Sequence, residues 1–238
     1  MHRQSSARRY PPSIASPSIR CEYHARRGGT VIDEHEALKA ERRNLYETLR
    51  GLAPTDWDAP TVCPGWRVRD VVAHVNVGAT IRLWKVLPGL VLAGGDFDRF
   101  MARHAARRGR RPVEVLLRES AVVAETARVP SVSKRVDVAI DVFVHHHDIA
   151  GPCGLEVPSD PARLRWLADG MVGGNRWLGS ARRLKGLRLI ATDIDWHYGT
   201  GPEVHATVPD LLLASCGRDV GPDRLRGEGA DRLRGTDR

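Results

Sequence analysis

Apolar residues recur at spacings of three and four over several long stretches of this chain, which predicts amphipathic helices. In the first stretch, Leu38, Leu45 and Leu49 form one stripe, and charged side chains occupy the opposite side. Proline or glycine borders several of the stretches, where a helix is expected to begin or end. The predicted helices cover residues 33–52, 66–87, 112–127, 134–149 and 161–177.

The pattern changes after the fifth helix. Residues 187–192 and 203–208 alternate between apolar and polar positions, as strands do, with a glycine-rich turn between them. A short helix is expected over 210–217. The fold class predicted is therefore mainly α, with an antiparallel four-helix bundle followed by a small C-terminal α+β domain.

The fourth predicted helix carries the most informative chemistry. It is apolar at almost every position except its acids and histidines, and a buried helix keeps ionisable groups only where they are paired or bind a metal. Asp141 and His145 are four residues apart and therefore share one face of the helix, and Asp148 comes next on the same face. A catalytic metal site needs three protein ligands. We expect His74, on the second helix, to be the third.

The other polar residues near this set have simpler expected roles. His146 and His147 point away from the Asp141 face and are expected to pack or lie at the surface. Asp148 and Asp70 could each hold a ligand imidazole in its tautomer. Two histidines and a carboxylate suit zinc and non-haem iron alike. The alternative is that the acids and histidines form only the solvated face of an amphipathic helix.

The net charge of +8 does not indicate a nucleic-acid-binding protein, because it is concentrated in a tail. Residues 1–29 hold six arginines and one glutamate, so the remainder carries only +3. A second basic cluster, Arg103 to Arg111, is interpreted as a solvated loop. There is no apolar run of about 18 residues, so no membrane span is expected.

Cysteine usage and composition suggest the cell compartment and the domain boundaries. Four widely spaced cysteines without a CxxC pair indicate a reducing cytoplasm, and Cys63 and Cys153 are taken as free thiols. We expect a disordered basic tail over 1–30, a helical bundle over 31–153 and an α+β domain over 154–238. An alternative for the tail is that translation starts near Val31.

Two segments resemble a known family. Residues 63–74 (CPGWRVRDVVAH) and 141–149 (DVFVHHHDI), with WDAPT at 57–61 ahead of them, are similar to the mycothiol-dependent maleylpyruvate isomerase family of DinB-like metal-binding bundles. Residues 191–196 (ATDIDW) and 211–218 (LLLASCGR) resemble its C-terminal domain more weakly.

The resemblance implies a divalent metal, expected to be Zn²⁺, on His74, Asp141 and His145. The characterised isomerases have glutamate where this chain has Asp141, which puts the specific isomerase reaction in question. Arg218 resembles a family arginine that serves the active site, where a guanidinium could clamp a substrate carboxylate. A surface arginine is the alternative reading.

The function expected from the resemblance is thiol transfer, or cis-trans isomerisation of the maleylpyruvate type, with mycothiol as cofactor. The partners expected are this small-molecule thiol and an electrophilic substrate, and the protein is expected to be a monomer or homodimer in an actinobacterial cytoplasm. The alternative is a non-catalytic bundle that senses metal or thiol.

Overall fold

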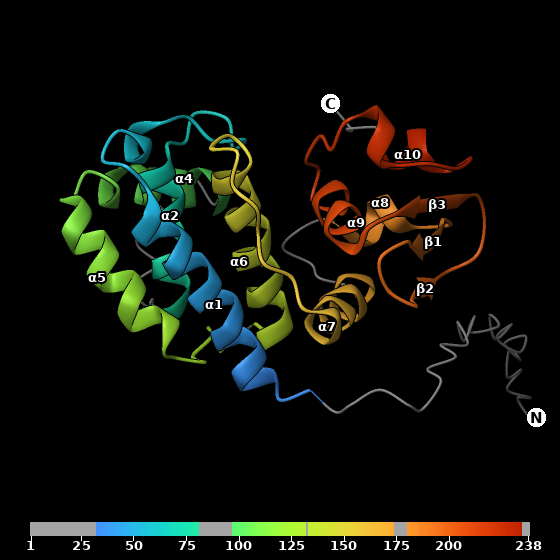
Figure 1. Cartoon of the computed structure of the whole chain (residues 1–238), viewed down its shortest axis with the longest axis horizontal. Coiled ribbons are helices and arrows are strands. Elements are labelled where there is room, and N and C mark those ends of the chain that lie inside the picture. The colour runs from blue at the N-terminus through green and yellow to red at the C-terminus, as the bar shows by residue number, and fades with distance from the viewer. Residues whose placement is uncertain (1–31, 81–96, 132, 174–179, 235–238) are drawn as a thin grey trace, which may run out of the picture.

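The computed structural model describes residues 32–80, 97–131, 133–173 and 180–234. Four helices form a bundle (Figure 1), and a further helix, α4, packs against α2. The bundle helices are α1 (Glu34–Gly51), α2 (Val68–Thr80), α5 (Val113–Ala124) and α6 (Arg135–Ala150), and α4 spans Phe97–Arg108. The predicted bundle is confirmed; the basic tail at 1–30 and the predicted end of the second helix, 81–87, lie outside the described residues.

Local signals set where these helices begin. The Asp33 carboxylate accepts the backbone N–H groups of His35, at 2.8 Å, and Glu36, at 3.3 Å, which caps α1. Asp137, in the first turn of α6, accepts the N–H of Lys134 at 3.2 Å. The boundaries expected for α1 and α6 agree with the structure to within one residue, whereas α5 ends three residues before the predicted end at 127.

The interpretation of Arg103 to Arg111 as a solvated loop is wrong, because α4 covers most of it. Arginine is a good helix former, and Ala105 is buried within this basic stretch. Glu119 on α5 pairs with Arg108 at 3.1 Å and also with Arg111. A cross-helix ion pair therefore binds the cluster to the bundle.

The C-terminal unit contains the expected strands and one that was not expected. Its sheet has the order β2-β1-β3, with β1 parallel to β3 and antiparallel to β2. The glycine-rich segment between the two predicted strands thus supplies the additional strand, which is two residues long. The elements are α7 (Pro161–Val172), α8 (Ser180–Leu184), β1 (Arg188–Ala191), β2 (His197–Tyr198), β3 (Glu203–Ala206), α9 (Val208–Ser215) and α10 (Ala230–Arg234).

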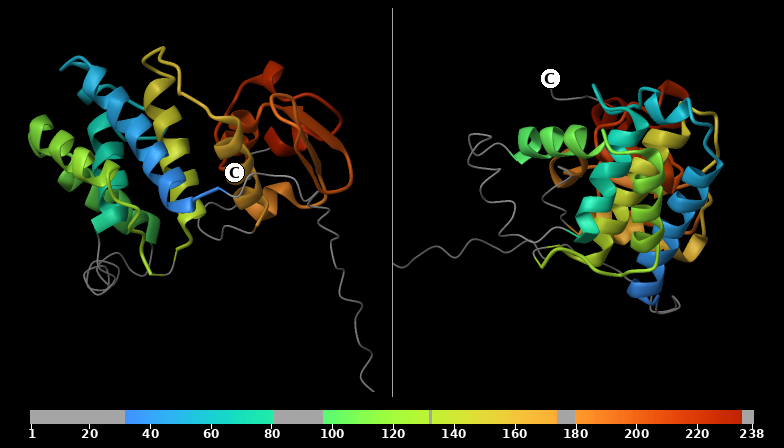
Figure 2. Two further views of the ribbon diagram at one scale, coloured as in Figure 1. Left: turned by 60° about the horizontal axis from the view of Figure 1, so that its bottom comes forward. Right: turned by 90° about the vertical axis from the view of Figure 1, so that its left-hand side faces the viewer.

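Helix α6 is shared by two hydrophobic clusters found among the described residues. One cluster lies inside the bundle and takes Val142 and Ile149 from α6. The other takes Ile140 and Phe143 from α6 and continues through α7 into the C-terminal unit. Figure 2 shows α7 between the bundle and the sheet. None of the described helices is long and apolar enough to cross a membrane.

Candidate metal centre

Helices α2 and α6 bring the three predicted ligands together. His74 Nε2 lies 3.8 Å from Asp141 Oδ2, and His145 Nε2 lies 3.5 Å from Asp141 Oδ1. One donor atom from each residue lies within 4.8 Å of the others. A tetrahedral zinc ion with ordinary bond lengths holds its ligand atoms about 3.3–3.6 Å apart. These residues could therefore hold a divalent metal, and Asp141 reaches both imidazoles in spite of its short side chain.

The carboxylate of this triad is charged and accessible. The Asp141 side chain is 32% exposed, whereas those of His74 and His145 are 17% and 10% exposed. Burial raises the pKa of Asp141, but the electrostatic attraction of His145 and His74 outweighs it and brings this pKa down to about 2. Asp141 is thus ionised at neutral pH, as a metal ligand must be.

An indole packs over both histidines. The Trp66 ring stacks on His145, with ring centroids 6.3 Å apart, and meets His74 edge-on at 5.2 Å. The two imidazoles themselves meet at 4.9 Å. Sequence reasoning placed Trp66 only at the beginning of a helix, because aromatic packing between separate elements leaves no pattern in the sequence.

Asp148 holds His145 from the side opposite to Asp141. Its Oδ2 atom lies 2.9 Å from His145 Nδ1, as expected for a carboxylate that orients a ligand imidazole. Asp148 is buried, which raises its pKa, but hydrogen bonds from His145 and Arg218 reverse the shift and hold the pKa well below its usual range. Helix α6 therefore fixes both nitrogens of one imidazole.

Asp70 does not play the corresponding role for His74, and that expectation is wrong. Both carboxylate oxygens of Asp70 bind Arg67: Oδ2 accepts the backbone N–H at 3.1 Å and Nε at 3.0 Å, and Oδ1 accepts Nη2 at 3.1 Å. His74 Nδ1 is buried without a hydrogen-bond partner among the described residues. Asp70 therefore caps the beginning of α2 through the backbone N–H of Arg67, and the Arg67 side chain occupies the rest of its carboxylate.

Arg218 extends to the centre from the C-terminal unit and forms an ion pair with Asp148. Its Nε donates to Oδ1 at 3.0 Å and its Nη2 to Oδ2 at 2.7 Å, a bidentate pair. Nη1 donates to the carbonyl of Cys216 at 3.1 Å. The guanidinium thus braces a carboxylate of the protein itself, which is a different contact from the substrate clamp expected from the sequence.

The backbone conformation at the end of α9 sets the direction in which the Arg218 side chain points. The N–H of Gly217 donates to the carbonyl of Ala214, and that of Arg218 to the carbonyl of Leu213, both at 2.9 Å. With Gly217 at φ +79°, these bonds form a Schellman motif. Glycine is suited to this position because it tolerates positive φ.

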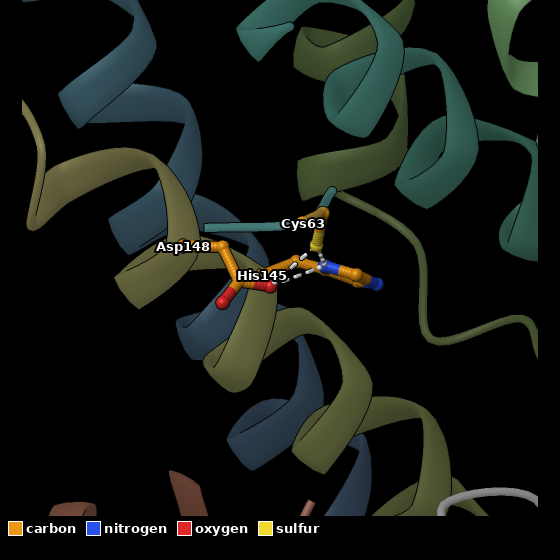
Figure 3. A group of neighbouring side chains, drawn as sticks. All are labelled: Cys63, His145 and Asp148. Carbon is orange, nitrogen blue, oxygen red and sulfur yellow. Dashed lines mark hydrogen bonds and ion pairs between the residues drawn. The ribbon is translucent and has the colours of Figure 1, made fainter. Parts of the chain in front are cut away.

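Cys63 was not singled out as a site residue, yet it lies in the centre. Its thiol donates to Asp148 Oδ2 at 3.1 Å and lies 3.8 Å from His145 Nδ1 (Figure 3). A turn places it: the N–H of Trp66 donates to the carbonyl of Cys63 at 3.0 Å, across Pro64 and Gly65 at φ +77°. Burial and the charge of Asp148 raise the pKa of Cys63 to about 12.

The two neighbouring histidines are structural, as expected. His146 is fully buried and its Nε2 lies 2.7 Å from Thr48 Oγ1 on α1. His147 Nδ1 lies 2.9 Å from the carbonyl of Phe143, one turn earlier. Neither belongs to a group of donors that could hold an ion among the described residues.

A pocket of about 590 Å³ opens beside this centre, where the end of α6 meets the C-terminal unit. Asp148 and Arg218 form part of its wall. Other lining side chains carry charge or hydroxyl groups, among them Glu156, Thr207 and Arg224. The pocket could receive a polar small molecule next to the braced carboxylate.

Comparison with known proteins agrees with this architecture. Residues 38–150 match the family model for the mycothiol maleylpyruvate isomerase N-terminal domain. The fold resembles the crystal structure of the mycothiol-dependent maleylpyruvate isomerase, with TM-score 0.55, 14% identity and coverage of 82% of this chain and 91% of that chain. A histidine-to-alanine mutant of that enzyme gives TM-score 0.54 with the same identity and coverage.

No curated protein matches this chain in sequence. The structural likeness, at 14% identity, shows the fold, and the family model covers residues 38–150, which form the bundle. The bundle, residues 38–150, is therefore similar to the mycothiol maleylpyruvate isomerase N-terminal domain, and the chain shares the fold of the solved isomerase.

Proposed function

We propose that this protein is a metal-dependent enzyme that uses mycothiol to act on an electrophilic small molecule, by isomerisation or by thiol transfer. The observation that carries the proposal is the convergence of His74, Asp141 and His145 from two helices at distances that suit a divalent ion. The match of residues 38–150 to the mycothiol maleylpyruvate isomerase N-terminal domain supports the choice of thiol.

In this proposal His74, Asp141 and His145 hold the ion, and zinc suits the two imidazoles and one carboxylate. When bound, the metal would supply an open coordination position at which a thiol is favoured as thiolate. Asp148 keeps His145 in the tautomer that leaves Nε2 free as a ligand. Arg218 neutralises Asp148 and closes one side of the centre.

The surroundings of the triad support the same role. Trp66 covers the two imidazoles, which limits the access of water. The pocket beside Asp148 and Arg218 is large enough for part of a thiol cofactor or its substrate. A cytoplasmic location and an actinobacterial origin fit a mycothiol-dependent enzyme and stay predictions.

Elemental analysis of the full-length chain, prepared without a histidine tag, tests the metal site. We expect about one zinc per chain in the parent, and loss of stoichiometric metal in His74→Ala, Asp141→Ala and His145→Ala. His197→Ala is the matched control, since His197 is an exposed residue of β2. Full metal occupancy in all three variants would refute the site.

Turnover then tests the enzyme. The zinc-loaded parent is assayed with maleylpyruvate and related electrophiles, with and without mycothiol, and the His145→Ala variant serves as the blank. Thiol-dependent turnover that the variant loses is expected. A metal-loaded parent that neither binds mycothiol nor changes any electrophile contradicts the enzymatic proposal.

A further inference from the structure

A second set of donor atoms lies beside the triad and shares only His145 with it. Cys63 Sγ, His145 Nδ1 and Asp148 Oδ2 face one another in Figure 3. Their separations are 3.1 Å from sulfur to oxygen, 2.9 Å from nitrogen to oxygen and 3.8 Å from sulfur to nitrogen. Thiolate, imidazole and carboxylate are all ligands of zinc-like ions.

The separations suit a tetrahedral ion. With metal–sulfur bonds of about 2.3 Å and metal–nitrogen or metal–oxygen bonds of about 2.0–2.2 Å, the donors would lie about 3.3–3.6 Å apart. Each observed separation is within about half an ångström of that range. Small side-chain rotations would therefore be enough to admit an ion.

Each donor is held in place by contacts outside the set. The backbone turn at Pro64 and Gly65 fixes Cys63, and helix α6 carries the other two donors. Arg218 Nε holds the Oδ1 atom of Asp148 at 3.0 Å, which turns Oδ2 toward the sulfur. Arg218 Nη2 also donates to Oδ2 and lies 3.6 Å from the sulfur, so this nitrogen has to move away when an ion binds.

One member of the set lies at the pocket described above. Asp148 and Val62, the residue before Cys63, both line that pocket. The pocket thus borders the set on the side of His145 Nδ1, whereas the triad lies at the other nitrogen of this ring.

We propose that Cys63, Asp148 and His145 Nδ1 form a second cation position, suited to a thiophilic divalent ion and alternative to the triad. Binding replaces the S–H bond by a sulfur–metal bond, and the thiol proton leaves to solvent. His145 then carries its proton on Nε2, facing Asp141. A neutral imidazole can serve one position at a time, so the two sites compete for His145.

Cadmium titration of the metal-free, full-length Asp141→Asn variant tests this proposal, because the triad no longer competes in it. The measurement is the ultraviolet charge-transfer absorption that a thiolate gives when it binds Cd²⁺. We expect a band that saturates at about one Cd²⁺ per chain, as a single site requires. Combining Asp141→Asn with Cys63→Ser should abolish the band, and combining it with Cys153→Ser should leave it unchanged.

The conservative serine keeps the turn at Cys63, and the unfolding temperature of each variant verifies that it is folded. A missing band in Asp141→Asn, or a band that survives Cys63→Ser, overturns the proposal. The result is independent of the triad, because the zinc content of the parent and of the single Cys63→Ser variant tests that site separately.

Discussion

Arg218 holds Asp148 with two hydrogen bonds, of 3.0 Å from Nε and 2.7 Å from Nη2, across the junction between the bundle and the C-terminal unit. Asp148 in turn contacts His145, so the side chain of Arg218 stabilises a proposed metal ligand without touching the ion itself.

Truncation of this arginine should weaken metal binding. In Arg218→Ala, Asp148 loses its bidentate partner and holds His145 less firmly, so zinc affinity is expected to fall about 10–100-fold. The zinc affinity of Arg218→Lys should lie between those of the parent and Arg218→Ala, because lysine keeps the charge but cannot form the bidentate pair. Competition with a chromophoric chelator measures the affinity. Arg43→Ala, which breaks an exposed pair with Glu125, is the control. Equal affinity in Arg218→Ala and the parent contradicts the bracing role.

The backbone that aims Arg218 depends on Gly217. At φ +79°, an alanine is strained, and Gly217→Ala should lower the free energy of unfolding by about 1–2 kcal/mol. Its Cβ would come 2.9 Å from Arg183 Nη2, a flexible end that can move away. Denaturant unfolding measures the loss. Gly51→Ala, at the open end of α1, should cost nothing. A fully stable Gly217→Ala would show that the Schellman geometry is unimportant.

Close contact between α6 and α7 depends on Gly170. A Cβ at this position would lie 2.1 Å from Val136 Cγ2, so Gly170→Ala overpacks the contact and should cost about 1–3 kcal/mol of unfolding free energy. Adding Val136→Ala removes the clashing methyl groups. The double mutant should therefore lose less than the sum of the two single losses in a double-mutant cycle. Additive losses would contradict a direct clash.

The buried Glu41 should make stability depend on pH. Burial raises its pKa, and the ion pair with Arg163 at 2.8 Å reverses only part of this shift. The folded state therefore binds the proton more tightly than the unfolded state does, and stability falls as pH rises from the usual pKa of 4.5 through the folded value. Glu41→Gln lacks this slope. Denaturant unfolding of both proteins between about pH 4 and pH 7 should show that the parent loses unfolding free energy relative to Glu41→Gln as pH rises. Parallel curves would contradict the shift.

The bundle and the pairing of Asp141 with His145 were predictable because both depend on spacing within single helices. Leu38, Leu45 and Leu49 repeat with the helical period, and Asp141 and His145 are one turn apart, so a regular pattern carries the information. The contacts of Cys63, Trp66 and Arg218 depend on two turns and on the docking of α9 near α6. Those contacts join segments up to 155 residues apart, and no local pattern records them.

Helix α4 and strand β2 were missed for a different reason. The basic residues of α4 look solvated until Glu119 is known to lie opposite them. Strand β2 is only two residues long and exists because β1 offers it a free edge. Similarly, the role expected of Asp70 was wrong because the competition between His74 and Arg67 for one carboxylate is decided by three-dimensional proximity.

Helix α6 alone carries Asp141, His145 and Asp148, whereas the other members of the centre arrive from three separate segments. Helix α6 therefore sets the position and orientation of the His145 imidazole, whereas Cys63 and Arg218 can each be substituted separately. Sequence changes in the turn at Cys63 or at the end of α9 would therefore alter the surroundings of His145 and leave the spacing of Asp141 and His145 along α6 unchanged.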